Sequence, residues 1–172
     1  MDVLAVVGLF LGNGGVPKSP VDFAEVTSAG LVGDRQKVRR IHGGPTRALC
    51  LWSAEVLQEL IDEGHPLFPG ACGENILVAG IDWTTLNTGA RLTLGPVTAE
   101  LTEATTPCRK IRPYFAGGAV RRVDHIQYPG YGRWYASVVT PGTINIGDPV
   151  VWEGPAHPQA RPGLFMNSTH LR

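Results

Sequence analysis

The sequence has no excess of either charge. Its 172 residues contain fifteen lysines and arginines against fifteen aspartates and glutamates, which gives a formal net charge of zero. A neutral chain has no general electrostatic attraction for nucleic acid or for an anionic membrane. We therefore expect neither as a partner, and attraction for a charged ligand has to come from local clusters.

Cysteine and long hydrophobic runs are also scarce. The chain has three cysteines, Cys50, Cys72 and Cys108, and no CxxC pair, which is not the pattern of a disulfide framework or of a zinc ribbon. The apolar run at 3–11 is too short to cross a bilayer, and Asp2 precedes it where a secretory signal would carry basic residues. These features predict a cytoplasmic protein in a reducing compartment.

Hydrophobic residues make up 43% of the chain, enough for one domain with a real core. One helix is clear at 54–63, with Ser53 as its N-cap and Gly64 at its end. The sequence predicts a mainly-β, barrel-like domain at 1–153 with one or two short helices, followed by an irregular tail at 154–172. Short strand-like runs separated by glycine and proline occur at 3–11, 21–27, 47–52, 75–78, 91–94, 97–103, 133–140 and 149–152.

One cysteine stands in a distinctive setting. Pro107 fixes the backbone just before Cys108, and Arg109 and Lys110 follow it. Cations beside a thiol favour the thiolate, the form that acts as nucleophile or metal ligand. The alternative is that Cys108 is a small buried hydrophobe, which is the role that we predict for Cys50 in its covered strand.

Basic residues gather in two segments. Residues 33–47 hold five of the fifteen lysines and arginines against one acid, Asp34, and residues 109–122 hold five more with no acid. If the two segments meet in space, they form a basic pocket for a small anionic ligand. Two separate solvated basic surfaces are the alternative.

The first basic segment also carries residues suited to chemistry. His42 precedes the turn Gly43-Gly44-Pro45, where an imidazole can accept a proton from a thiol or hold an anion. Arg35 and Arg47 have the planar donors that bind phosphate or carboxylate in pairs. On their residue types alone, the better interpretation is that His42 is a satisfied loop histidine and Asp34 a turn-capping acid.

Six motifs, taken in order, resemble the MOSC domain, which is named for the C-terminal part of molybdenum cofactor sulfurases. The resemblance is to the small stand-alone bacterial members, a group that includes the 6-N-hydroxylaminopurine-resistance type, and it covers residues 3–151. The motifs are GLVGDR (30–35), HGGPTRALCLWS (42–53), PGACGEN (69–75), GIDWTTLNTGARLTLG (80–95), TPCRK (106–110), and WYASVVTPG with IGD (134–142 and 146–148).

The resemblance implies a β-rich domain in which Cys108 is the functional thiol, either a molybdenum ligand in a bound molybdopterin-type cofactor or a persulfide sulfur carrier. It implies His42 and Lys110 as catalytic partners of Cys108. The cofactor can be bound stably or only transiently. The implied cofactor-binding positions are Asp34, Arg35, His42, Gly43, Gly44, Arg47, Glu74, Asn75 and Arg109.

The implied activity is reduction of N-hydroxylated compounds or transfer of sulfur to the molybdenum cofactor. An electron-donor protein or a cysteine desulfurase would be the partner. A carrier or binding module without turnover is the main alternative, and a cysteine hydrolase that uses Cys108 and His42 is another. Pyridoxal phosphate binding belongs to the fused family members, whose desulfurase domain precedes the MOSC domain.

This chain departs from the family pattern at two places. Ser137 stands where the family commonly has arginine, and Arg133 stands where glycine is usual. In an extended segment, positions 133 and 137 share a face, so Arg133 can supply the cation. Cys72 replaces a large apolar residue and is either a second thiol for an oxidised Cys108 or a small hydrophobe that fills a pocket.

Overall fold

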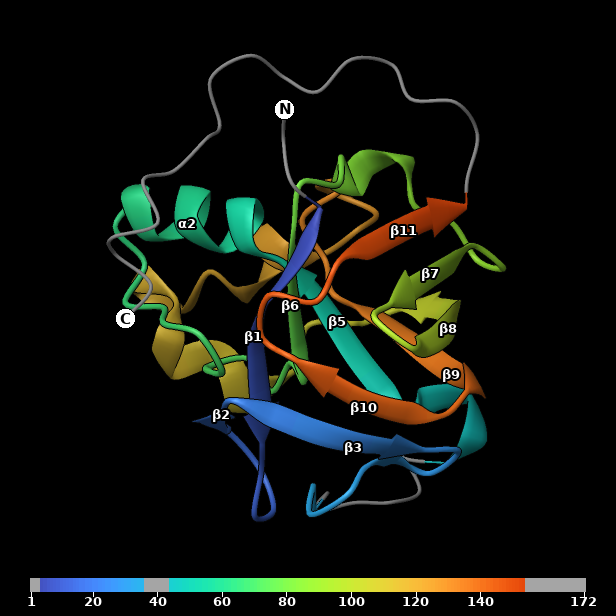
Figure 1. The fold of residues 1–172 in the computed structure, drawn as a ribbon. Helices are drawn as coiled ribbons and strands as arrows, with labels where there is room; N and C mark the ends of the chain where they lie inside the picture. The colour runs from blue at the N-terminus through green and yellow to red at the C-terminus, as the bar shows by residue number, and fades with distance from the viewer. Residues whose placement is uncertain (1–3, 36–43, 154–172) are drawn as a thin grey trace.

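An eight-stranded sheet forms the body of the computed structural model, which describes residues 4–35 and 44–153 (Figure 1). The predicted tail at 154–172 lies outside the described residues. The sheet has the order β11-β7-β8-β9-β5-β6-β1-β2. Its strands are β1 (Ala5–Leu11), β2 (Ser19–Val21), β5 (Leu49–Ser53), β6 (Ile76–Ala79), β7 (Arg91–Leu94), β8 (Val97–Ala104), β9 (Trp134–Thr140) and β11 (Val150–Glu153).

A second sheet of three strands lies at one end of the first (Figure 1). It has the order β10-β3-β4, with β10 at Gly142–Asn145, β3 at Phe23–Thr27 and β4 at Gly30–Leu31. Ala24, Val26 and Ile144 of this sheet are buried, whereas Phe23 is exposed. The small sheet therefore adds its own apolar face to the core.

The large sheet curls towards itself between β1 and β11. Ala5 and Pro149 form a single antiparallel bridge, and the N–H of Val6 donates to the carbonyl of Asp148 at 2.9 Å. Within the described residues no continuous ladder joins these two strands. The mainly-β prediction is thus confirmed, and "barrel-like" describes the curl only loosely.

β5 belongs to the core along its whole length, since all five of its residues are buried. β5 lies inside the sheet between β9 and β6, and α2 (Ala54–Asp62) packs on β5 and β6. Trp52 and Leu51 are fully buried, and complete burial of a large apolar side chain stabilises a fold by about 1.5–3 kcal/mol. The prediction that both faces of this strand are covered is confirmed.

The predicted helix is confirmed with its cap. The hydroxyl of Ser53 accepts a hydrogen bond from the N–H of Val56 at 3.2 Å, which satisfies one free donor at the start of α2. Gly64 has φ of 98° after the last turn, a conformation that favours glycine. The buried side chains Leu57 and Leu60 face the sheet, so amphipathicity and capping together fix this element.

Other predicted elements differ from the structure. The strand expected at 47–52 begins only at Leu49, because Pro45 opens a 3-10 turn, η1 (Pro45–Arg47). β10 is absent from the predictions. The 109–123 region forms 3-10 turns: η3 (Arg109–Tyr114), η4 (Ala116–Gly118) and η5 (Val120–Val123), and a further one, η2, spans Trp83–Thr85.

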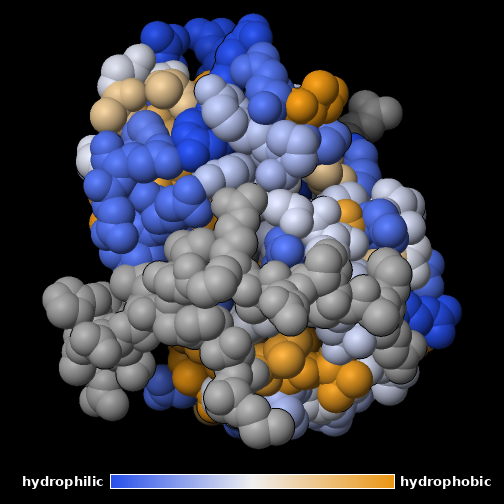
Figure 2. Space-filling model, turned by 90° about the horizontal axis from the view of Figure 1, so that it is seen from above, coloured by the Kyte–Doolittle hydropathy of each residue, from blue (hydrophilic) through white to orange (hydrophobic). Residues whose placement is uncertain are grey.

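Hydrophilic side chains predominate on the face shown in Figure 2, and hydrophobic ones gather in several separate places. Among the described residues, the large exposed hydrophobic side chains are spread over several elements and loops, including Phe23, Phe68 and Ile126. Scattered residues of this kind are common on protein surfaces. In the described ranges, no helix has the length and apolar character needed to cross a membrane.

Candidate functional site

A pocket lies where several strands of the large sheet begin or end. Its lining includes five residues that the sequence predicts for the site: Cys108, Lys110, Arg35, Arg47 and Asn75. They come from segments that are far apart in the chain. The structure therefore brings the TPCRK segment and the first basic segment to one hollow.

Strand pairing explains this convergence. β9 lies between β8 and β5 and runs antiparallel to both, so Ala104 at the end of β8 and Leu51 in the middle of β5 pair with Trp134 at the start of β9. The N–H of Thr105 donates to the carbonyl of Arg133 at 2.8 Å, and Cys50 pairs with Tyr135 in the ladder. These pairings hold the segment before Cys108 against the same strand end as Arg133.

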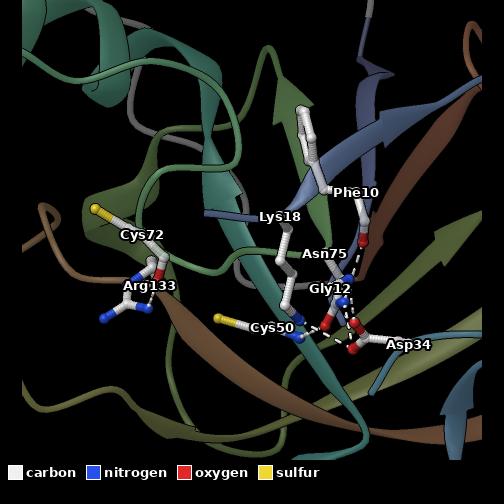
Figure 3. A network of polar contacts seen from close by, with 8 residues as sticks. All are labelled: Phe10, Gly12, Lys18, Asp34, Cys50, Cys72, Asn75 and Arg133. Atoms are coloured by element: carbon white, nitrogen blue, oxygen red, sulfur yellow. Dashed lines mark hydrogen bonds and ion pairs between the residues drawn. The ribbon is translucent and has the colours of Figure 1, made fainter. Parts of the chain in front are cut away.

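Asn75 connects β6 to three other segments. Its Oδ1 accepts from the N–H of Cys50 at 3.1 Å, and its Nδ2 donates to the carbonyl of Phe10 at 3.3 Å. The same Nδ2 donates to Oδ2 of Asp34 at 2.9 Å. The amide thereby fixes one wall of the pocket (Figure 3).

Asp34 does not line the pocket but supports residues that do. Its Oδ1 accepts from the N–H of Gly12 at 2.7 Å, and its Oδ2 accepts from Nζ of Lys18 at 2.9 Å. The side chain of Asp34 is 4% exposed and that of Lys18 is 8% exposed, so the ion pair is buried. Asp34 thus holds Lys18, a pocket residue, in place.

Glu74 likewise lies outside the lining. Its carboxylate is buried and accepts from the N–H of Gly70 at 2.6 Å and from the N–H of Cys72 at 3.2 Å. Burial raises the pKa of Glu74, although these hydrogen bonds and Arg133 act in the opposite direction. Its observed contacts fix the turn that presents Cys72.

Of four further predicted positions, the structure describes two. Gly44 is described and has φ of 94°, as the turn before Pro45 requires, but it does not line the pocket. Arg109 is exposed and also lies outside the lining. His42 and Gly43 lie outside the described residues.

The three thiols of the pocket differ in accessibility. All are free, and Cys108 is half-buried whereas Cys50 and Cys72 are 6% and 1% exposed. Burial raises the pKa of both Cys50 and Cys72, so these two stay protonated near neutral pH. Cys108 is therefore the thiol that a ligand or reagent in the pocket reaches first.

Positive charge surrounds these thiols. Lys110 and Arg35 are exposed at the pocket, and Arg47 forms an ion pair with Glu103 at 2.5 Å while its guanidinium carbon lies 5.1 Å from the ring centre of Tyr135. Burial raises the pKa of Tyr135 to about 12, so its phenol is neutral. The pocket is suited to an anion.

Arg133 is the most buried cation of the pocket, at 6% exposure. Its Nη1 donates to the carbonyl of Cys72, and Figure 3 shows the side chain beside that residue. Ser137 takes no part in the lining; its hydroxyl approaches the carbonyl of Glu100 at 3.5 Å. Arg133 thus lines the pocket, whereas position 137, which was expected to share its face, does not.

Sequence reasoning missed Lys18 and Tyr135 and assigned Cys50 only to the core. Lys18 lies outside both basic segments, and only its buried contact with Asp34 marks it. Cys50 is buried as predicted, yet it also lines the pocket. The sequence contains no local signal for such shared roles, because they depend on strand pairing.

Comparison with known proteins agrees with the architecture. The chain is 27% identical to the protein YiiM of Escherichia coli (strain K12) over 129 residues, 73% of this chain and 57% of YiiM. It is 30% identical to the Bacillus subtilis (strain 168) protein YflK over 118 residues, 67% of this chain and 52% of YflK. The chain thus spans about half the length of these curated relatives.

Solved structures share the fold. The crystal structure of YiiM from Geobacillus stearothermophilus has a TM-score of 0.68 at 21% identity, covering 87% of this chain and 75% of that one. That of Escherichia coli YiiM has a TM-score of 0.65 at 24% identity, covering 91% and 71%. The family model described as the MOSC domain matches residues 38–151, more than half of the sequence. The chain therefore belongs to the MOSC domain family.

Proposed function

We propose that the pocket binds a molybdenum cofactor, or a similar phosphorylated anionic ligand, and that Cys108 is the functional thiol. One observation carries this proposal: Cys108 is the half-buried thiol of a pocket that Lys110 and Arg35 also line. A thiol and several cations in one hollow can hold a ligand that is both anionic and metal-bearing. The cytoplasmic location expected from the sequence is part of the same proposal.

The donor set fits such a cofactor. The thiolate of Cys108 is a soft ligand of the kind that suits a soft or high-valent metal. Arg35, Arg47 and Lys110 supply donors for phosphate oxygens, and arginine binds these in pairs. When bound, the cofactor would supply two-electron redox chemistry at its metal.

The residues of the chain have separable roles in this proposal. Cys108 would hold the metal-bearing group, and Lys110 and Arg35 would attract and orient the anionic part. Asn75 and Asp34 would keep the wall rigid through the bonds described above. His42, outside the described residues, remains the predicted proton partner of the thiol.

Two activities are consistent with this arrangement. One is reduction of N-hydroxylated compounds, with electrons from a donor protein. The other is sulfur transfer, in which the Cys108 thiolate attacks the outer sulfur of a persulfide on a cysteine desulfurase. The sulfur–sulfur bond of the donor breaks, its thiolate leaves, and a persulfide forms on Cys108. A carrier without turnover is the second candidate, because the same pocket can hold a ligand without reacting.

Purified protein separates these possibilities. Molybdenum is measured by elemental analysis, persulfide by mass spectrometry after incubation with a persulfide donor, and reductase activity with an N-hydroxylated base. We expect Cys108→Ser to lose activity and persulfide formation while its melting temperature stays near that of the wild type, since Cys108 is only half-buried. Ligand binding without turnover in the wild type would indicate the carrier. Full activity in Cys108→Ser would remove the thiol from the mechanism.

A further inference from the structure

The guanidinium of Arg133 is a buried charge whose hydrogen-bonding capacity is only partly used. It is 6% exposed, and its Nε has no hydrogen-bond partner among the residues that the structure describes. Its Nη1 donates to the carbonyl of Cys72, and its side chain also forms a hydrogen bond with the side chain of Cys50. An unsatisfied buried donor is costly and rare, so it calls for an explanation.

Within the described ranges, no carboxylate forms an ion pair with Arg133 at 4.0 Å or less. The carboxylate that interacts electrostatically with Arg133 is that of Glu74. Its two oxygens already accept from the backbone N–H groups of Gly70 and Cys72. The other side chains near the guanidinium are the thiols of Cys50 and Cys72 and the phenol of Tyr135. Burial raises the pKa of all three, so they are neutral.

Arg133 also lines the pocket that contains Cys108. The backbone carbonyl of Arg133 accepts from Thr105, three residues before Cys108, so the two residues are held on adjoining segments. Lys110 and Arg35 are exposed at the same pocket, whereas Arg133 is shielded from solvent. The pocket thus has exposed cations and two buried ones, Lys18 and Arg133, and of these two Lys18 already forms an ion pair with Asp34.

We propose that Arg133 is a separate inner anion subsite that takes a tetrahedral oxyanion, such as the phosphate group of the ligand, through its Nε and an adjacent Nη donor. An oxyanion there would satisfy the Nε and neutralise a buried charge, and a guanidinium presents such paired donors in a fixed plane. Low exposure strengthens the interaction relative to one at the surface. The subsite adds a second contact to the ligand binding proposed above. It depends on that proposal only for the identity of the natural ligand.

Inorganic phosphate is the probe, titrated into the full chain by calorimetry. We expect saturable binding to the wild type and a loss of affinity of roughly tenfold or more in Arg133→Gln. Arg133→Lys, which keeps the charge but not the planar fork, should fall between them. The matched control is Arg91→Gln, because Arg91 is an exposed arginine on β7 whose partner is Glu100; its affinity should equal that of the wild type.

A measurement on the wild type covers the case in which Arg133→Gln fails to fold. The Nε–H signal of Arg133, assigned in NMR spectra by its disappearance in Arg133→Lys, should move as phosphate saturates the site. An unmoved signal, absence of phosphate binding, or equal affinity in Arg133→Gln would each overturn the subsite. Phosphate binding by Cys108→Ser separates the two proposals, because the subsite requires that binding to persist whether or not the thiol proves functional.

Discussion

The side-chain amide of Asn75 donates a 2.9 Å hydrogen bond to Oδ2 of Asp34, the same oxygen that accepts from Nζ of Lys18 at 2.9 Å. One carboxylate oxygen therefore joins β6 to the segment that carries Lys18 (Figure 3). Both Asn75 and Lys18 line the pocket, whereas Asp34 does not. The acid acts on the pocket through its neighbours.

The first prediction concerns this buried ion pair. Asp34→Asn leaves the ammonium of Lys18 without its counter-ion. It also replaces one carboxylate oxygen with an amide nitrogen, which cannot accept the hydrogen bonds that Gly12 and Asn75 donate to Asp34. Removal of one partner from a buried pair costs about 3–5 kcal/mol, so we expect the free energy of unfolding, measured by urea denaturation, to fall by about that amount.

Glu103→Gln is the matched control for Asp34→Asn. This substitution breaks the ion pair with Arg47. The side chains of Arg47 and Glu103 are 30% and 46% exposed, and an exposed pair of that kind contributes only about 0–1 kcal/mol to the free energy of unfolding. Equal losses in the two variants would show that the Asp34 pair is not buried in solution. Adding Lys18→Met to Asp34→Asn should recover part of the loss, because no unpaired charge then remains.

The second prediction concerns the accessibility of the thiols. In the native protein, iodoacetamide should modify Cys108 well before Cys50 or Cys72, because the latter two are 6% and 1% exposed and burial raises their pKa. Peptide mass mapping after timed quenching measures this order. In Cys108→Ser, native protein should remain nearly unlabelled, and all remaining cysteines should react once urea unfolds it. Early labelling of Cys72 would contradict the predicted order.

Local signals explain which elements were predictable. β7 spans Arg91–Leu94, as predicted, because glycine and proline mark its limits. The helix after Ser53 carries a cap, an apolar stripe and a terminal glycine, all readable within a dozen residues. β10 had no such signal: it begins at Gly142, and its partner is β3, more than a hundred residues earlier in the chain.

The residues of the site likewise divide into those that a short stretch of sequence reveals and those that only the folded chain reveals. Cys108 and Lys110 stand out because one short segment contains proline, a thiol and cations. The structural roles of Asp34 and Glu74 could not be read locally, since each depends on backbone donors that only the folded chain brings near. Arg133 stands out in the sequence as a departure from a family pattern. Its burial, and the lack of a partner for its Nε among the described residues, depend on the β8–β9–β5 arrangement.

The third prediction uses the buried carboxyl group of Glu74. Burial raises its pKa in the folded state, whereas an unfolded chain has the ordinary value of about 4.3. The folded state therefore binds this proton more tightly than the unfolded state. Its contribution to stability is fully present below about pH 4.3 and is lost as the pH rises through the folded pKa.

Glu74→Gln cannot titrate, so it isolates this contribution. The difference between the unfolding free energies of wild type and Glu74→Gln should shift in favour of the wild type as the pH falls from neutral to about 4, by about 1.4 kcal/mol for each unit by which the pKa is raised. Urea denaturation at a series of pH values measures both proteins, and the subtraction removes the contribution of other titrating groups. Because the carboxylate accepts from Gly70 and Cys72, the variant also loses one acceptor, which offsets the two curves by a constant. Two parallel curves would show that the carboxyl group has the same pKa in the folded and unfolded chains.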